Sequence, residues 1–408
     1  MSNRAGFRSA LRVRDFRALA AARLISMLGD SAAFLAVTVL VYQRTGSSLL
    51  SSLTFAISFV PYLFGGSLLS SSIDRFPVRA LIIGTDLLGA LFVGLLTIPV
   101  VPIWLIFLAL FAIGIMSPVR SAGIDTVTAD LLPGESYVAG RSIQRVISQV
   151  SQLVGIGLGG LLIAPFGVRG ALGIDVLSFL ASALIIRLGT AAYPRRRVEA
   201  AATNLATDSL TGLRESWRLA PVRRLLMLGW LVPFVAVWPE ALAAPAVADA
   251  HRPASLVGIW LTAIPVGMII GNLGAVWLPG TAWRPRAMYP LALTVPLIML
   301  LFLLQPPFLL ALILLALTGL ESCYSLELDR RLRDTIPLDL RPRAFALNST
   351  GLMVSQGLGF VAAGAAGQFA RPATVIGIGG VIGLAGVVVL WVRARTPNPS
   401  RQEKSVLV

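Results

Sequence analysis

The sequence predicts an all-α integral membrane protein that crosses the bilayer twelve times. The chain has 408 residues, of which 56% are hydrophobic and 13% charged, whereas a soluble domain carries about 25% charged residues. Its apolar residues gather in stretches of roughly 20, the length at which a helix spans the ~30 Å hydrocarbon core. Arginines gather at every second junction between these stretches. These three observations favour a multi-pass helical protein over a soluble enzyme.

Each apolar stretch is expected to form one spanning helix. The first follows a basic segment of 16 residues and is too long for the apolar region of a cleaved signal peptide, so it is expected to be retained. In chain order the twelve stretches are residues 17–41, 47–71, 80–99, 102–119, 138–163, 170–190, 225–247, 254–278, 287–304, 307–324, 344–369 and 373–392.

The arginine pattern predicts the orientation. Short arginine-rich loops stay in the cytoplasm, so both termini are predicted to be cytoplasmic. Arg120, Arg141 and Arg145 are assigned to the inner junction after span 4, and Arg44 and Arg169 to outer junctions. The net charge of +15 is thereby explained by topology and by contact with anionic membrane lipids, and no nucleic-acid partner is expected.

The rare reactive residues exclude several classes of site. Cys323 is the only cysteine and His251 the only histidine, so neither an intramolecular disulfide nor a His/Cys metal site is expected. The glycines Gly155, Gly159 and Gly160 lie within an apolar span, which is the wrong context for a dinucleotide loop. They are expected to allow close helix packing. No phosphate-binding loop is present, and no cofactor is expected.

The chain divides near its middle. Six spans lie in residues 1–190 and six in 225–408, separated by a polar cytoplasmic linker, 191–224, with an amphipathic helix from Leu210 to Leu219. The halves share residues at a constant offset: Val150-Ser151-Gln152 matches Val354-Ser355-Gln356, and Gly155 matches Gly359. Because spans 5 and 11 both start inside, the repeat is parallel and predicts two like-oriented six-helix bundles.

The turn between spans 2 and 3 carries a family resemblance. It runs from Ser70 to Arg79 as SSSIDRFPVR and resembles the G-x-x-x-D-R-x-G-R-R signature of the major facilitator superfamily. The resemblance implies that Asp74, Arg75 and Arg79 form a cytoplasmic latch. A carboxylate at a positive helix end with arginine partners fits that role. A solvated turn that only helps topology is the alternative.

Shorter strings resemble the macrolide-efflux-like branch of drug exporters. They include Ser26 to Asp30, the turn Thr45-Gly46-Ser47, and the span 6 segment Asp175 to Phe179. Two positions depart from exporter signatures. Aligning span 4 on Gly114 places Leu110 and Ile113 where many proton-coupled exporters have R-x-x-Q-G, and Ile156 replaces the proline of G-P-x-x-G-G.

Ionisable residues inside spans are the candidate transport chemistry, because charge at membrane depth needs a partner, water or a function. Asp30 in span 1 is the leading proton or cationic-substrate site, since a carboxylate in a cavity lets a proton and a cationic drug compete. The alternative is a permanent pair with Arg23, two helical turns earlier. Glu240, beside Pro239 in span 7, is a possible second carboxylate or an outer-leaflet group that reaches water.

Further polar residues occur in other spans. Gln152 and its repeat partner Gln356 are expected to face the cavity or bridge helices. Asp86 is expected to pair with an inner arginine or line a path, Asp175 to be structural, and Glu321 to support the gate.

The sequence and the resemblance together predict a secondary active transporter rather than an enzyme. It is expected to export lipophilic or amphipathic, drug-like small molecules by alternating access, with protons as the coupling ion and the bacterial inner membrane as its location. Two alternatives stay open, an exporter of an endogenous metabolite such as a siderophore and a non-transporting membrane sensor or scaffold.

Overall fold

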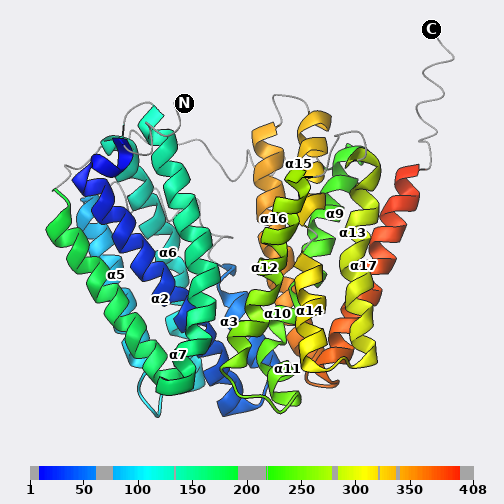
Figure 1. The fold of residues 1–408 in the computed structure, drawn as a ribbon, viewed down its shortest axis with the longest axis horizontal. Coiled ribbons are helices and arrows are strands. Elements are labelled where there is room, and N and C mark those ends of the chain that lie inside the picture. Colours follow the sequence, from blue (N-terminus) through cyan, green and yellow to red (C-terminus); the bar gives the residue numbers. More distant parts are fainter. Residues whose placement is uncertain are drawn as a thin grey trace, which may run out of the picture. The chain divides into compact units, whose positions relative to one another are not determined.

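The structure, a computed structural model, is helical throughout the residues that it describes (Figure 1). Those residues are 9–60, 77–132, 135–191, 217, 219–277, 284–319, 322–336 and 341–395. The chain forms two compact units. Unit 1 consists of Met1–Ala202 with Ala243–Thr262, and unit 2 of Thr203–Leu242 with Ala263–Val408. Of the predicted linker helix from Leu210 to Leu219, only Trp217 and Leu219 belong to the described part, and the latch residues Asp74 and Arg75 lie outside it.

Unit 1 is built on long helices that run beside one another. Its helices are α2 (Arg14–Thr45), α3 (Ser48–Ile57), α5 (Val78–Leu96), α6 (Ile103–Leu131), α7 (Glu135–Gly189), and α11 (Ala243–Asp249) with the first turns of α12. Helix α7 packs against both α2 and α5, and α5 also packs against α6. Each of α2, α6 and α7 exceeds the ~20 residues needed to cross a bilayer.

Local signals set the ends of these helices. Helix α2 stops at Gly46, which adopts the left-handed conformation (φ 62°) that glycine tolerates best. The Ser47 hydroxyl then accepts a hydrogen bond from the Leu50 amide and caps α3. Helix α7 breaks at Gly167, whose φ of 67° and ψ of 178° are not helical, two residues after Pro165. Its two arms correspond to predicted spans 5 and 6.

Unit 2 contains shorter pieces of helix. They are α9 (Ala220–Ala236), α10 (Trp238–Ala241), α12 (Leu256–Trp277) beyond its first turns, α13 (Arg284–Leu300), η1 (Leu301–Leu304), α14 (Phe308–Gly319), α15 (Ser322–Thr335), α16 (Arg341–Ala366) and α17 (Pro372–Arg395). Helix α17 packs against α13 and α9, and α16 packs against α9.

Predicted span 7 is divided into α9, α10 and α11. Prolines recur every six residues, at Pro233, Pro239 and Pro245, and each removes a backbone donor from the helical ladder. The α10–α11 break falls at Leu242, where the chain passes from unit 2 to unit 1. The prolines therefore account for the interruption of an otherwise apolar span.

The structure corrects the predicted end of span 4. The sequence analysis placed Arg120 in a junction after residue 119, but α6 continues to Leu131 and Arg120 is buried inside it. A hydropathy pattern treats arginine as a loop residue, whereas here the charge is neutralised by carboxylates of neighbouring helices. Asp125 belongs to the same helical extension.

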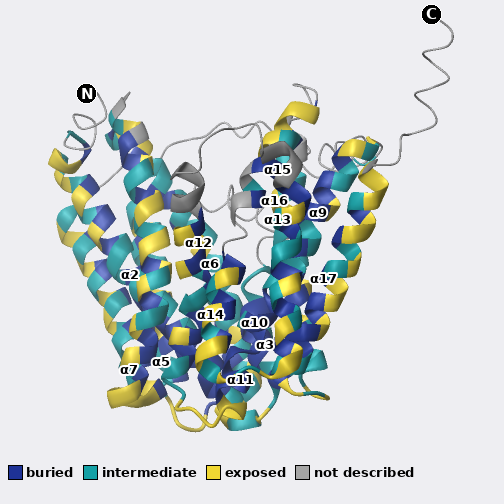
Figure 2. Cartoon of the chain, turned by 45° about the vertical axis from the view of Figure 1, so that its right-hand side comes forward, coloured by how far each residue is buried: buried dark blue, intermediate teal, exposed yellow. Residues whose placement is uncertain are grey.

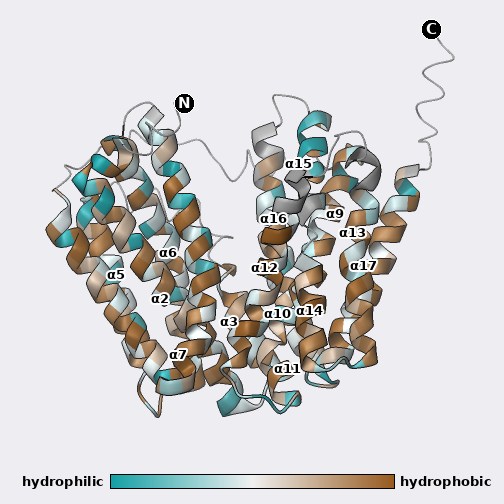
Figure 3. Cartoon of the chain, viewed as in Figure 1, coloured by the Kyte–Doolittle hydropathy of each residue, from teal (hydrophilic) through white to brown (hydrophobic). Residues whose placement is uncertain are grey.

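The outer surfaces of the helices are apolar, as a membrane-spanning protein requires. Among the described residues, six helices are long and apolar enough to cross a membrane, and one of them, Ala139–Gly189, is long enough for two crossings. Much of the exposed helix surface belongs to hydrophobic residues (Figures 2 and 3). Leu91, Leu184 and Val389 are among the exposed large hydrophobic residues. Lipid is the solvent that such a surface fits.

The internal repeat has an equivalent contact in each unit. A Cβ atom added to Gly155 on α7 would lie 2.8 Å from the Leu28 carbonyl oxygen on α2. A Cβ atom added to its repeat partner Gly359 on α16 would lie 2.3 Å from the Phe234 carbonyl oxygen on α9. Matched glycines thus let span 5 approach span 1 and span 11 approach span 7.

Candidate functional site

Four helices of unit 1 place charged side chains together inside the bundle. Arg120 on α6 lies between two carboxylates: its Nε is 2.7 Å from Asp86 Oδ1 on α5, and its Nη1 is 3.8 Å from Asp30 Oδ2 on α2. Ser182 on the second arm of α7 donates a hydrogen bond of 2.6 Å to Asp86 Oδ2. Arg120 Nη2 in turn donates to the Ser182 hydroxyl. We call Asp30, Asp86, Arg120 and Ser182 the Arg120 cluster.

The members of this cluster differ in exposure. Asp86 is completely buried, whereas 37% of the Asp30 side chain is exposed. A carboxylate buried in an apolar bundle is stable as an ion only with a close cation and hydrogen bonds. Asp86 has both, while among the described residues Asp30 has only the longer contact to Arg120. Asp30 is therefore the carboxylate of the cluster that can exchange its partner for water, a proton or a ligand.

Asp175 lies next to the cluster on the second arm of α7. It is 1% exposed, and its Oδ1 accepts a hydrogen bond of 2.8 Å from Ser178. The side chain packs against Gly29, where an added Cβ would fall 2.2 Å from Asp175 Oδ1. The glycine before Asp30 therefore leaves the space that this third carboxylate occupies.

A second cluster surrounds Asp125. Arg23 Nη1 lies 3.9 Å from Asp125 Oδ1, and Arg141 on α7 forms an ion pair with the same oxygen. Arg23 Nη2 also donates a 3.2 Å hydrogen bond to Ser148. The alternative prediction that Arg23 permanently neutralises Asp30 is therefore wrong in this structure, because Arg23 pairs with Asp125 and Asp30 with Arg120. These side chains line a cavity of about 520 Å³, which we call the Arg23 cavity.

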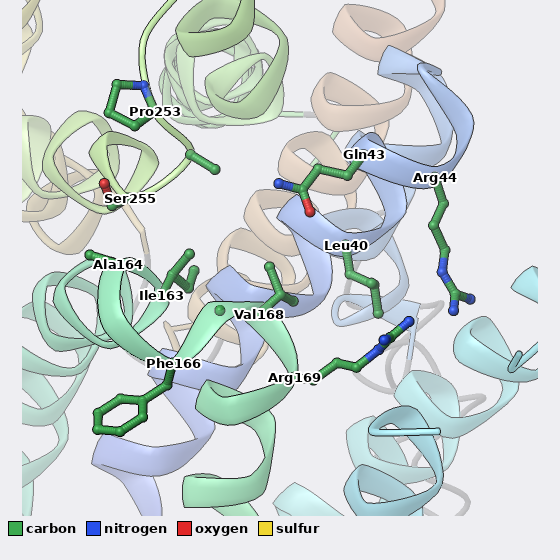
Figure 4. A pocket seen from close by; sticks show the side chains of 12 residues that line it. Leu40, Gln43, Arg44, Ile163, Ala164, Phe166, Val168, Arg169, Pro253 and Ser255 are labelled. Carbon is green, nitrogen blue, oxygen red and sulfur yellow. The ribbon is translucent and has the colours of Figure 1, made fainter. Parts of the chain in front are cut away.

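A larger cavity of about 750 Å³ lies at the opposite end of unit 1 (Figure 4). It is formed by the last turn of α2, the bend of α7 and the segment before α12. Arg44 and Arg169 both donate to the Pro99 carbonyl oxygen, and Arg44 also donates to the Val101 carbonyl. Because carbonyls satisfy these arginines, the end of α2, the α5–α6 connection and the second arm of α7 are tied together.

The other predicted site residues lie elsewhere. Glu240 is half-buried in α10 of unit 2 and forms no ion pair with a described residue. Gln152 is exposed on α7, and Gln356 is half-buried on α16. Among the described residues, no group of three His, Cys, Asp or Glu side chains is placed to hold a metal ion.

Of the predicted latch, only Arg79 is described. It donates a hydrogen bond to the Arg187 carbonyl at the end of the second arm of α7. The three glycines of span 5 lie at two interfaces. Gly159 packs against Ala32 of α2, where an added Cβ would lie 2.9 Å from the Ala32 Cα, and Gly160 packs against Gly258 of α12.

Sequence reasoning missed Arg120 and Asp125 as members of the site. The signal that could have found them is the stretch after residue 119, in which Arg120 and Asp125 precede Leu131 without an intervening proline. Pro118 lies inside α6 and does not end it. Leu110 and Ile113 still stand where the exporter signature has arginine and glutamine, and Arg120 lies later in the same helix.

Comparison with known proteins identifies the family. The sequence profile of the Major Facilitator Superfamily matches residues 19–247, which is more than half of the chain. This chain belongs to the major facilitator superfamily. It is therefore a multi-pass membrane transporter rather than an enzyme, and the predicted all-helical superfamily fold is confirmed.

Superfamily relatives include drug efflux proteins. Macrolide efflux protein A of Streptococcus pyogenes is 24% identical over 264 residues, and the match spans 63% of this chain and 65% of that protein's length, slightly less than two thirds. The multidrug efflux pump Tap of Mycobacterium tuberculosis is 27% identical over 361 residues, which cover 82% of this chain and 84% of Tap. The predicted resemblance to macrolide-efflux-like exporters is confirmed at this distance.

Solved structures of other transporters share the fold over nearly the whole chain. The nucleoside transporter NupG aligns with a TM-score of 0.69 at 14% identity, covering 93% of this chain and 99% of NupG. The POT family transporter PepTSo aligns with a TM-score of 0.67 at 13% identity, covering 94% of this chain and 98% of PepTSo. At such identities the likeness shows the fold alone.

Proposed function

We propose that this superfamily member is a secondary exporter of lipophilic or amphipathic small molecules that exchanges its substrate for protons. The observation that carries the proposal is the shared arginine: Arg120 neutralises the buried Asp86 and holds Asp30 by a longer contact. The relatedness to macrolide and multidrug efflux proteins supports export of drug-like compounds. Alternating access is the mechanism by which the superfamily fold moves a substrate.

The physical cycle follows from the competition for Arg120. When Asp30 is ionised, the Arg120 guanidinium interacts with two carboxylates, those of Asp30 and Asp86. A proton on Asp30 removes one of them, so that Arg120 is left to Asp86 and Ser182. A cationic or polar substrate group that displaces this proton reverses the change. Proton and substrate thus bind in exchange, which is the requirement for antiport.

The remaining parts of the proposal concern orientation and gating. We place both termini on the cytoplasmic side of a bacterial inner membrane, on the arginine distribution. Asp74, Arg75 and Arg79 are proposed as the cytoplasmic latch, and Glu240, Gln152 and Gln356 as further groups of the transport path. The division into a 1–190 bundle, a 191–224 linker and a 225–408 bundle is retained as the proposed domain organisation.

Everted membrane vesicles test the proposal. Energised vesicles that contain the protein are expected to accumulate ethidium, and a protonophore is expected to release it. Asp30→Asn is expected to abolish accumulation with normal protein levels, because Asn cannot exchange a proton. The matched control is Asp249→Asn, which alters an exposed carboxylate outside the Arg120 cluster and is expected to retain accumulation. Full activity of Asp30→Asn would overturn the assignment of the proton site.

A further inference from the structure

The Arg23 cavity carries an excess of positive charge. Its lining includes Arg23, Arg141 and Arg145 but only one carboxylate, Asp125, among the described residues. Two of the arginines share that carboxylate, which leaves an excess of two positive charges. A cavity lined mainly by charges of one sign attracts ligands of the opposite sign. The cavity is therefore suited to an anion.

Two residues of the cavity wall, Gln144 and Arg23, carry buried polar atoms without hydrogen-bond partners among the described residues. Gln144 lines the cavity and is 3% exposed, yet neither its amide nitrogen nor its amide oxygen has a hydrogen-bond partner among the described residues. The Nε and Nη1 atoms of Arg23 also lack hydrogen bonds there. Leaving a buried polar group without a hydrogen bond destabilises a protein. A ligand with acceptor oxygens would accept hydrogen bonds from the Gln144 amide nitrogen and from the Arg23 guanidinium.

The wall of the cavity continues as two parallel tracks along α7. One track is polar and exposed, consisting of Arg141, Arg145, Gln149 and Gln152, which recur at helical spacing. The other is apolar and begins inside the cavity with Val146, 55% exposed, followed one turn apart by the exposed Val150 and Val154. A ligand whose anionic group contacts the arginines would therefore have an apolar surface beside it, against which the apolar part of the same ligand can pack.

We infer that the Arg23 cavity is a binding site for the anionic group of an amphipathic molecule, such as a carboxylate, sulfonate or phosphate. Arg145 and Arg141 contact the anion, Gln144 donates to it from the cavity wall, and the valine track of α7 contacts the apolar body. The volume of about 520 Å³ lies within the range of small-molecule sites. The inference rests on the proposed transport function for its physiological meaning, since it extends the expected substrates to organic anions.

A matched set of probes tests the site without requiring transport. The full-length protein is placed in phosphatidylcholine nanodiscs, and its thermal unfolding is followed with phenylbutyrate, the neutral phenylbutanamide and the cationic phenylbutylammonium. Ligands that bind the folded state raise the unfolding temperature in proportion to their saturation. Phenylbutyrate is expected to bind at least about fivefold more tightly than its neutral amide. This ratio of dissociation constants corresponds to one exposed ion pair of ~1 kcal/mol.

Two variants assign the effect to the cavity. Arg145→Gln is expected to weaken phenylbutyrate binding about three- to tenfold. Gln144→Leu is expected to abolish it while the ligand-free protein unfolds at the same or a higher temperature, because an unpaired buried amide is removed. A merely structural Gln144 would leave binding unchanged. The control Arg17→Gln neutralises an exposed arginine of α2 that does not line the cavity and is expected to bind like the wild type.

The anionic group could also come from a lipid headgroup. A comparison of nanodiscs of two lipid compositions distinguishes a bound lipid from a free organic anion. If phosphatidylglycerol fills the site, the wild type will be more stable in phosphatidylglycerol than in phosphatidylcholine nanodiscs, and Arg145→Gln will lose that difference. Equal stabilisation by phenylbutyrate and phenylbutanamide, with no Arg145-dependent lipid effect, would overturn the inference. The unfolding assay measures binding directly, so a negative result there would not contradict the proposed export function. A failure of ethidium export would likewise not contradict anion binding in the Arg23 cavity.

Discussion

Arg120 and Asp86 form an ion pair of 2.7 Å between α6 and α5, and the Asp86 side chain has no exposed surface. The pair joins two helices of unit 1 that are adjacent in the chain, and Ser182 of α7 adds a third. Because Asp30 competes for the same guanidinium, one arginine links the packing of the unit to the proposed exchange of protons.

Breaking this ion pair is expected to destabilise the protein. Arg120→Leu leaves Asp86 buried without its cation, which costs about 3–5 kcal/mol. Removing both charges in Arg120→Leu/Asp86→Leu is expected to recover much of that loss. Thermal unfolding in detergent measures both variants, and a double variant no more stable than Arg120→Leu would contradict the role assigned to the pair.

The glycine contact between α7 and α2 is expected to be intolerant of a side chain. In Gly155→Ala the new Cβ would lie 2.8 Å from a carbonyl oxygen, so the helices must separate, at a cost of about 1–3 kcal/mol. The control is Gly173→Ala on the second arm of the same helix, where nothing lies within 4 Å. There the helix is expected to gain up to ~1 kcal/mol. Unfolding temperatures of the two variants should therefore move in opposite directions.

The prolines in span 7 are expected to affect the rate of alternating access more than the stability of the protein. Pro239→Ala restores a backbone donor between α9 and α11 and is expected to lower the initial rate of ethidium accumulation at least about threefold with unchanged protein levels, because lost hinge freedom slows alternating access. Pro290→Ala removes a proline from α13 and is the comparison. Equal rates in both variants would remove the hinge from the mechanism.

Cysteine labelling tests the predicted orientation. In a Cys323→Ser background, Ser2→Cys and Ser405→Cys are expected to react with a membrane-impermeant maleimide only after cells are permeabilised. Arg252→Cys, at a predicted outer junction, is expected to react in intact cells. Labelling of the two ends of the chain from opposite sides would exclude the parallel arrangement of six plus six spans.

The helical membrane fold was predictable because it depends on properties that are local in the sequence. Apolar length and composition identified the spans, and the glycine offset between Gly155 and Gly359 indicated the repeat. The boundary of span 4 was not predictable in this way. Arg120 resembles a loop residue until its partners are known, and Asp86 and Ser182 lie 34 and 62 positions away in the chain.

The candidate site could be predicted only in part for the same reason. Asp30 was recognised from its depth in an apolar span, but the partner considered for it, as the alternative to a free transport site, was Arg23 on the same helix. Pairing within one helix can be inferred from spacing, whereas pairing between helices depends on rotation and packing. The structure exchanges the partners, so that Arg23 contacts Asp125 and Asp30 contacts Arg120.

The convergence of Arg44 and Arg169 on Pro99 has a consequence for resistance to acid. Guanidinium groups keep their charge at any physiological acidity, and a backbone carbonyl has no proton to gain or lose. Hydrogen bonds between arginine and a backbone carbonyl therefore persist when the pH falls, whereas ion pairs made by aspartates do not. At an end of unit 1 that faces the outside of the cell, these hydrogen bonds would hold the loops in place at low pH. The carboxylates deeper in the protein would still be able to bind protons.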